Sequence, residues 1–138
     1  RIKEGDWMII DIENELYNVI KTELNDVNVE KEKKKKSVSF PCITITEISN
    51  NIDENTVDTS GETHNVQAFE INIFTSGNLK VSIAKTLRKR VDNIMSDTYK
   101  MSRDFSSQTP NYVDEDIYRY TLRYSCIVSK NKKIYRGY

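Results

Sequence analysis

Histidine and cysteine are the side chains that most often serve as general base and nucleophile, and this chain of 138 residues has one histidine and two cysteines. Paired in space, His64 and Cys42 would make a thiol-dependent catalytic site. No motif brings them together, since His64 ends an acidic, irregular segment and Cys42 belongs to a β-branched run. The sequence therefore favours a loop histidine and a buried strand cysteine, and we expect no enzyme.

Calcium and magnesium prefer oxygen ligands such as the carboxylates of Asp and Glu. Two groups of acidic residues are therefore candidate ligands. The first group lies in the segment 50–63 and consists of Asp53, Glu54, Asp58 and Glu62. Their spacing lacks the ligand order and the central glycine of an EF-hand loop. The second group, residues 114–116, precedes a strand-like run and is typical of a solvated turn. The four glycines are isolated and form no phosphate-binding loop, so we expect neither a metal nor a cofactor.

Aromatic residues that alternate with arginines are typical of platforms for single-stranded nucleic acid, and residues 117–129 have this alternation. In a strand, however, successive side chains point to opposite faces. Tyr118, Tyr120 and Tyr124 then share one face with apolar residues, whereas Arg119 and Arg123 lie on the other. The tyrosines are therefore predicted to pack in the core rather than to stack on bases.

The spacing of apolar residues predicts the elements that position these side chains. Helical spacing covers residues 9–24 and about 79–98. β-branched or alternating runs predict strands over residues 37–48, 66–75, 99–105 and 117–129. The order α-β-β-α-β-β indicates an α+β fold, with a mainly antiparallel sheet and two helices packed on one face. Its predicted core comprises Leu16, Ile20, Phe69, Ile71, Ile73, Ile83, Leu87, Val91, Leu122 and Tyr124.

The segments between these elements are polar. Residues 30–36, which read EKEKKKK, are predicted to form a solvated turn, and residues 50–63 a long loop. A polar turn is expected around Pro110. The length predicts a single domain spanning residues 1–138. Codons for Lys-Glu-Gly-Asp can resemble a bacterial ribosome-binding site, so our hypothesis is that Met8 is the start and 1–7 a non-native leader; the alternative is an ordinary N-terminal arm.

Overall composition excludes some classes of protein. No stretch approaches 18 apolar residues, so we expect no membrane-spanning helix. Lys and Arg total 21 and Asp and Glu total 21, and this zero balance argues against a general nucleic-acid binder. Two distant cysteines make no disulfide framework, which favours a reducing compartment such as the cytoplasm.

The charges are neutral in sum but unevenly distributed. Residues 37–79 carry six acids and no lysine or arginine, whereas residues 80–103 carry seven basic and two acidic groups, and residues 117–138 six basic groups and no acid. Unless folding mixes these zones, opposite signs on different faces suit head-to-tail association of identical subunits. The candidate assembly residues are Asp53, Glu54, Asp58, Glu62, Lys85, Arg88, Lys89, Arg119 and Arg123.

An amphipathic helix, a strand containing FPCITITEI, a polar loop, a strand NVQAFEINIFT, a helix KVSIAKTLRKRVDNIM and a closing β-region IYRYTLRYSCIV follow one another. Over residues 8–130, this chain resembles the small neck proteins of tailed bacteriophages, in particular the tail terminator (tail-completion) family. The resemblance is one of length, element order and composition, without an invariant motif. It implies a structural subunit that forms a hexameric ring on the tail tube, stops tube polymerisation and presents a surface to the head connector.

The resemblance also implies partners and a location. The partners are further copies of the chain, the tail tube protein, the head–tail connector and, in a contractile tail, the sheath protein, with DNA only passing through the lumen. The location is a virion tail or a headless tail-like particle, such as a phage-tail-like bacteriocin, assembled in the cytoplasm of a bacterial host. Two alternatives stay open: a head-closure or head–tail joining protein, and a small nucleic-acid-binding protein that uses residues 33–36 and the basic C-terminal strand.

Overall fold

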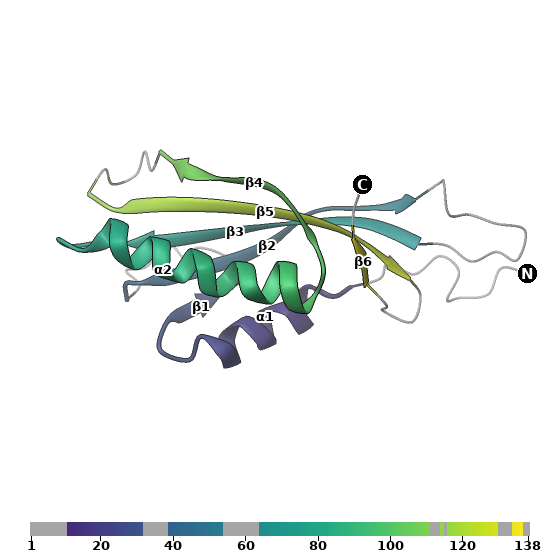
Figure 1. The fold of residues 1–138 in the computed structure, drawn as a ribbon, viewed down its shortest axis with the longest axis horizontal. Coiled ribbons are helices and arrows are strands. Elements are labelled where there is room, and N and C mark those ends of the chain that lie inside the picture. Colours follow the sequence, from purple (N-terminus) through teal and green to yellow (C-terminus); the bar gives the residue numbers. More distant parts are fainter. Residues whose placement is uncertain are drawn as a thin grey trace, which may run out of the picture.

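The computed structural model describes residues 11–31, 39–53, 64–110, 114, 116–129 and 134–136. Its elements are α1 (Glu13–Glu23), β1 (Asn28–Glu30), β2 (Cys42–Asp53), β3 (His64–Thr75), α2 (Lys80–Asp92), the π-helix η3 (Asn93–Thr98), β4 (Ser102–Thr109), β5 (Tyr118–Ser129) and β6 (Ile134–Arg136). The predicted α+β fold is confirmed: a mainly antiparallel sheet carries two helices on one face (Figure 1).

The sheet is long, twisted and mixed. Its strand order is β1-β2-β3-β5-β4, and β6 pairs with β5 as well. Only the pairing of β1 with β2 is parallel among the described strands, and the others are antiparallel. β3 lies at the centre of the sheet and pairs with β5 along its whole length, from His64 opposite Ser129 to Thr75 opposite Tyr118.

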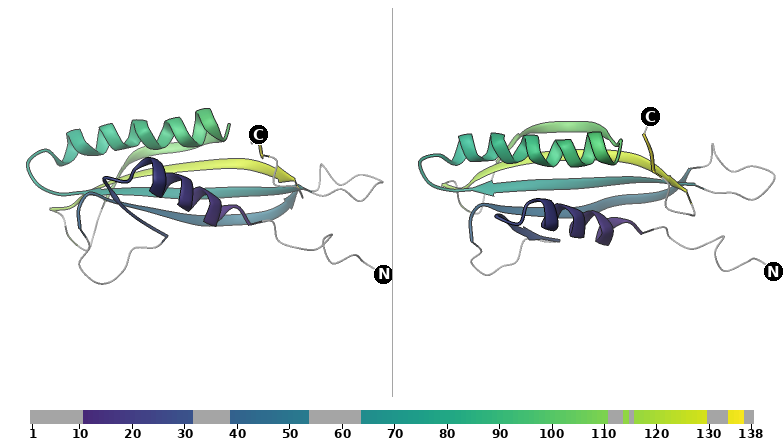
Figure 2. Two further views of the ribbon diagram at one scale, coloured as in Figure 1. Left: turned by 90° about the horizontal axis from the view of Figure 1, so that it is seen from below. Right: turned by 60° about the horizontal axis from the view of Figure 1, so that its bottom comes forward.

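The core lies between the helices and one face of this sheet. Alternation along β3 and β5 points Phe69, Ile71, Leu122 and Tyr124 toward the helices, and all four are fully buried. α1 packs over β1 and β2, whereas α2 packs over β3 and β5 (Figure 2). Nine of the ten predicted core residues are buried, and Ile83 is half-buried against the same core.

Several predicted bounds need correction. β2 begins at Cys42 rather than at residue 37 and continues to Asp53, so residues 50–53 are strand and not loop. β4 spans Ser102–Thr109 instead of 99–105. Two three-residue strands, β1 and β6, were not predicted, and Glu30 therefore belongs to β1 rather than to a solvated turn. Residues 1–10, with the proposed start at Met8, lie outside the described residues, as do 32–38 and 54–63.

A β-bulge explains why the alternation in β2 breaks at Ile48. Glu47 pairs with Phe69 and Ser49 with Ala68, so Ile48 is the extra residue, and it is exposed. Beyond the bulge, Asn50 faces the helix side together with Gln67 and Asn65. The Asn50 amide donates to Glu47 Oε1 (2.9 Å) and accepts from Asn65 Nδ2 (2.7 Å). The helix side of β2 is therefore apolar before the bulge, at Ile43 and Ile45, and polar beyond it.

The predicted second helix is confirmed, but its last six residues form a π-helix. Lys89 and Arg90 lie in the last turn of α2, where cations complement the helix dipole. Arg90 also forms a bidentate contact with Asp26, at 3.0 and 3.1 Å, which ties α2 to the turn after α1. Within the described part of the chain, neither helix is long and apolar enough to cross a membrane.

Candidate interaction surfaces

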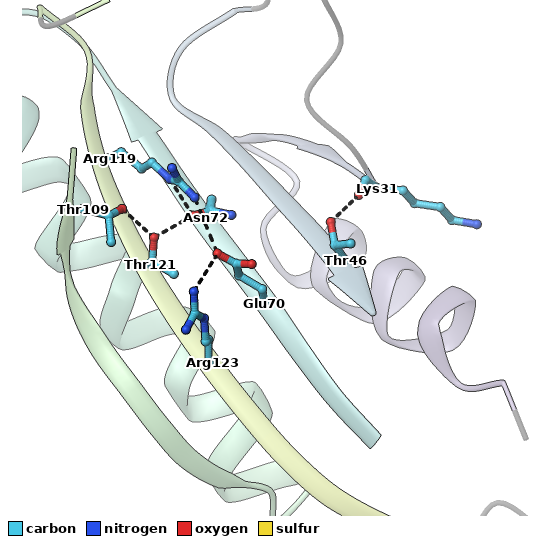
Figure 3. A network of polar contacts seen from close by, with 8 residues as sticks. All are labelled: Lys31, Thr46, Glu70, Asn72, Thr109, Arg119, Thr121 and Arg123. Atoms are coloured by element: carbon cyan, nitrogen blue, oxygen red, sulfur yellow. Dashed lines mark hydrogen bonds and ion pairs between the residues drawn. The ribbon is translucent and has the colours of Figure 1, made fainter. Parts of the chain in front are cut away.

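The face of the sheet that points away from the helices carries a ladder of polar side chains (Figure 3). The register places Glu70 opposite Arg123 and Asn72 opposite Thr121. Arg119 Nε donates to Asn72 Oδ1 at 2.9 Å, and Thr121 Oγ1 donates to the same oxygen at 2.7 Å. Since Thr121 has a single hydroxyl proton, Thr109 must be the donor in the 2.6 Å bond that joins these two threonines.

Glu70 is the acid of this ladder, and both predicted interface arginines reach it. Its Oε1 lies 3.5 Å from Arg119 Nη2 and 3.8 Å from Arg123 Nη2. Arg123 also stacks over the ring of Phe105, with 5.1 Å from its guanidinium carbon to the ring centroid. Glu70 therefore partly neutralises Arg119 and Arg123 within the subunit. As a result, this face of the sheet is polar rather than strongly basic.

Arg88, predicted as an assembly residue on the second helix, is likewise engaged within the subunit. Its Nη1 donates to the Tyr120 hydroxyl at 2.9 Å, and its guanidinium lies 5.0 Å from the centroid of that ring. Ser106 Oγ shares a 2.7 Å hydrogen bond with the same hydroxyl. Burial raises the pKa of Tyr120, but the bonds from Ser106 and Arg88 favour the ionised form, and the pKa is lowered overall.

Lys85 and Lys89 are different, because both are exposed and form no hydrogen bond or ion pair with the described residues. They line an open depression on the outer side of α2. Leu79 and Val81 line the same depression, with 67% and 41% of their surface exposed. We call Leu79, Val81, Lys85 and Lys89 the α2 face. It combines exposed apolar side chains with two cations that have no partner among the described residues.

Only one of the four predicted acidic residues, Asp53, lies within the described residues. It is the last residue of β2, and its backbone pairs with His64. The other three, Glu54, Asp58 and Glu62, lie outside the described residues. Most of the acidic half of the predicted interface therefore lies outside the described residues.

A different acidic group, which the sequence did not single out as a site, does come together at the start of α1. We call Asp11, Glu13 and Glu47 the α1 acidic cluster. Asp11 Oδ1 accepts from the Glu13 amide at 3.0 Å, and Glu13 Oε2 accepts from the Glu47 amide at 2.9 Å. Burial, opposed by an Asn50 hydrogen bond and reinforced by the Asp11 and Glu13 charges, raises the pKa of Glu47. Asp11 and Glu13 are near neighbours in the sequence, but Glu47 joins them only through the fold.

The pairing of His64 with Cys42 is excluded by the register. His64 lies opposite Asp53, whereas Cys42 lies opposite Phe74, at the other end of the same two strands. At 3.2–3.4 Å per residue this separation is roughly 30 Å. In the parts of the chain that the structure describes, no three His, Cys, Asp or Glu side chains gather closely enough to hold a metal ion. Residues 114–116 are described only at Asp114 and Asp116.

The tyrosines of β5 are core residues, as predicted. Tyr124 is fully buried and Tyr120 is 6% exposed, while Tyr118 packs against the edge of the core. Their rings face the helices, and the arginines of the same strand face the opposite side. β5 therefore offers no exposed row of aromatic rings on which nucleic-acid bases could stack.

Comparison of the chain with known proteins adds no assignment. No protein-family model matches it, and no curated protein matches it either.

Proposed function

We propose that this chain is the subunit of a tail terminator ring, which closes the end of a phage tail tube or of a headless tail-like particle. The observation that carries the proposal is the arrangement of the elements. α1, β2, β3, α2, β4 and β5 follow one another in the order on which the resemblance to that family rests. The strands form one continuous sheet, and both helices pack on the same face of it.

The distribution of charge supports the same proposal. A ring subunit must offer two different surfaces to its two neighbours, because a head-to-tail contact that closes is heterologous. Among the described residues, Lys85 and Lys89 lie unpaired on α2, and the crowded acids Asp11 and Glu13 lie at the start of α1. Two separate surfaces of opposite sign meet this requirement, and they set register and partner choice more than affinity.

In this function the subunit works by shape and contact, without a chemical step. The ring matches the rotational symmetry of the tube end with one rim, so that no further tube subunit can add. Its other rim is then free for the head connector. Exposed ion pairs contribute only about 0–1 kcal/mol each, so apolar contacts must supply part of the assembly energy. Leu79 and Val81 are exposed apolar side chains of the kind required.

Assembly of the purified protein tests the proposal. Sedimentation velocity over a range of concentrations, with negative-stain images of the same samples, should reveal rings, and added rings should stop the growth of purified tail tubes. A protein that stays monomeric at high concentration and fails to cap tubes would contradict the terminator function. Binding to a head connector without binding to tubes would instead indicate a head-closure protein. Salt-sensitive binding to bare DNA would indicate the nucleic-acid alternative.

A further inference from the structure

We propose that neighbouring subunits are joined by the α2 face of one copy docking on the α1 acidic cluster of the next. The α2 face comprises Leu79, Val81, Lys85 and Lys89, and the α1 acidic cluster comprises Asp11, Glu13 and Glu47. This contact rests on the proposed ring function and identifies the two surfaces that would form the ring.

The α2 face lacks the partners that the other cations of the helix have. Arg88 is bonded to Tyr120 and Arg90 to Asp26, whereas Lys85 and Lys89 have no hydrogen bond or ion pair with the described residues. Directly before and within the first turn, Leu79 and Val81 expose apolar surface to solvent. Exposed apolar side chains beside two cations that are unpaired among the described residues fit a partner that carries carboxylates beside aliphatic side-chain stems.

The α1 acidic cluster offers the opposite charge. None of its three carboxylates forms an ion pair with a lysine or arginine of the described residues. The nearby Lys31 donates instead to Asn14 Oδ1 at 2.7 Å. The cluster therefore carries like charges at close quarters, and bringing two cations to it lowers this repulsion.

The first turn of α2, with Leu79 and Val81, does not reach the α1 acidic cluster of the same subunit. α1 and α2 run in opposite directions on the sheet, and their first turns lie far apart along the long axis of the molecule (Figures 1 and 2). One copy must therefore use its α2 face on a second copy, which leaves its own acidic cluster free for a third. Such a contact is heterologous, and it propagates until the rotation between neighbours closes a ring.

The other predicted basic surface is a weaker partner for this contact. Arg119 and Arg123 already share Glu70, and Arg119 is further held by Asn72. Drawing them to a neighbour would break contacts within the subunit, whereas Lys85 and Lys89 lose none. The choice of a second copy over an unrelated acidic protein follows from this complementarity, since the chain carries both halves of the contact.

Charge swapping tests the contact. The double variants Lys85→Glu/Lys89→Glu and Asp11→Lys/Glu13→Lys each turn attraction into repulsion, and at low salt each should weaken association at least about tenfold. Mixing the two variants, or combining all four substitutions, should restore assembly. The variant Lys21→Glu/Lys100→Glu changes the net charge by as much as the first variant, at exposed positions outside the contact, and should assemble normally. Melting curves show whether each variant is folded.

A crosslink measures the contact directly, even if a charge variant folds poorly. Val81→Cys combined with Asp11→Cys, treated with a short bismaleimide, should yield a ladder of covalent oligomers, whereas each single variant should yield almost none. Cys42 and Cys126 are both buried and contribute little background. The following outcomes would overturn the proposal in distinguishable ways.

Rings that form equally well in both double variants would refute this contact and leave the terminator function standing. Charge variants that form rings but no longer cap tubes would assign the α2 face to the tube contact, and would also refute the proposal. A wild-type protein that forms no oligomer would refute both the contact and the ring. A closed symmetric dimer would refute the head-to-tail geometry.

Discussion

The hydroxyl of Tyr124 donates a 2.8 Å hydrogen bond to Oδ1 of Asp92, and this bond joins the middle of β5 to the last residue of α2. Ser96 Oγ donates to the same oxygen at 2.9 Å, and Arg103 Nη1 lies 3.1 Å from the other carboxylate oxygen. One carboxylate thus connects α2, η3, β4 and β5. Burial, together with Asp92, raises the pKa of Tyr124 well above its usual range, so the hydroxyl stays protonated as a donor.

We therefore predict that Tyr124→Phe lowers the free energy of unfolding by about 1–3 kcal/mol, because it removes a hydrogen bond to a charged group. Urea denaturation followed by circular dichroism measures this change. Tyr118→Phe, at a half-buried position whose hydroxyl makes no hydrogen bond with the described residues, is the matched control and should stay within about 0.5 kcal/mol of the wild type. Equal effects at the two positions would contradict a special role for the Asp92 contact.

Stability should fall at alkaline pH because of Cys126. Burial raises the pKa of this thiol to about 12, whereas an unfolded cysteine has a pKa of about 8.5. The contribution is therefore complete below about pH 8 and is lost as the pH rises toward 12, since only the unfolded chain releases the proton. The expected slope is about 1.4 kcal/mol per pH unit once the unfolded thiol is ionised. Urea titrations between pH 8 and 10 should show it in the wild type and lose it in Cys126→Ala.

Truncation of the core tests the placement of the second helix. Leu87 is 3% exposed and lies in the core between α2 and the sheet. Leu87→Ala should lower the free energy of unfolding by about 2–5 kcal/mol through lost burial and a residual cavity. Thr86→Ala, one position away on the exposed side, is the control and should change it by less than about 0.5 kcal/mol. An unchanged melting temperature in Leu87→Ala would show that this helix face is not buried.

Neutralising Glu70 separates the two candidate basic surfaces. Glu70→Gln releases Arg119 and Arg123, and it should cost the subunit no more than about 1 kcal/mol because both ion pairs are long and partly exposed. Assembly, measured by sedimentation at low salt, should be unchanged if neighbours meet through α2. Clearly tighter assembly in Glu70→Gln would instead identify the two arginines as the interface.

Much of the fold was readable from the pattern of residues, because long elements repeat their signal. The alternation in 66–75 and 117–129 gave both central strands and the correct faces for Phe69 and Tyr124. β1 and β6 span only three residues each, too few for any periodicity, and they exist because a neighbouring strand supplies their partners. Residues 50–53 are polar and look like a loop, yet pairing with β3 holds them as strand beyond the bulge at Ile48.

The interaction surfaces were only partly predictable. Lys85 and Lys89 were predicted as candidate assembly residues from the basic zone at 80–103. In the structure they are unpaired among the described residues. The ion pairs of Arg119 and Arg123 with Glu70 depend on the register of two strands that lie some fifty residues apart in the chain. No local sequence pattern encodes this register. The same holds for Glu47, which meets Glu13 across elements. Contacts that are set by register or by packing of distant segments are invisible to a single sequence.

The uninterrupted pairing of β3 with β5 also determines how the subunit should respond to force. Twelve consecutive residue pairs join these strands, and β2 is joined to the other side of β3 by eleven more. Hydrogen bonds between antiparallel strands lie across the strand axis. Tension along that axis must therefore shear all of them together, whereas tension at right angles separates them pair by pair. The subunit should be stiffest along its length, so that a ring with strands parallel to the pull transmits load without unfolding.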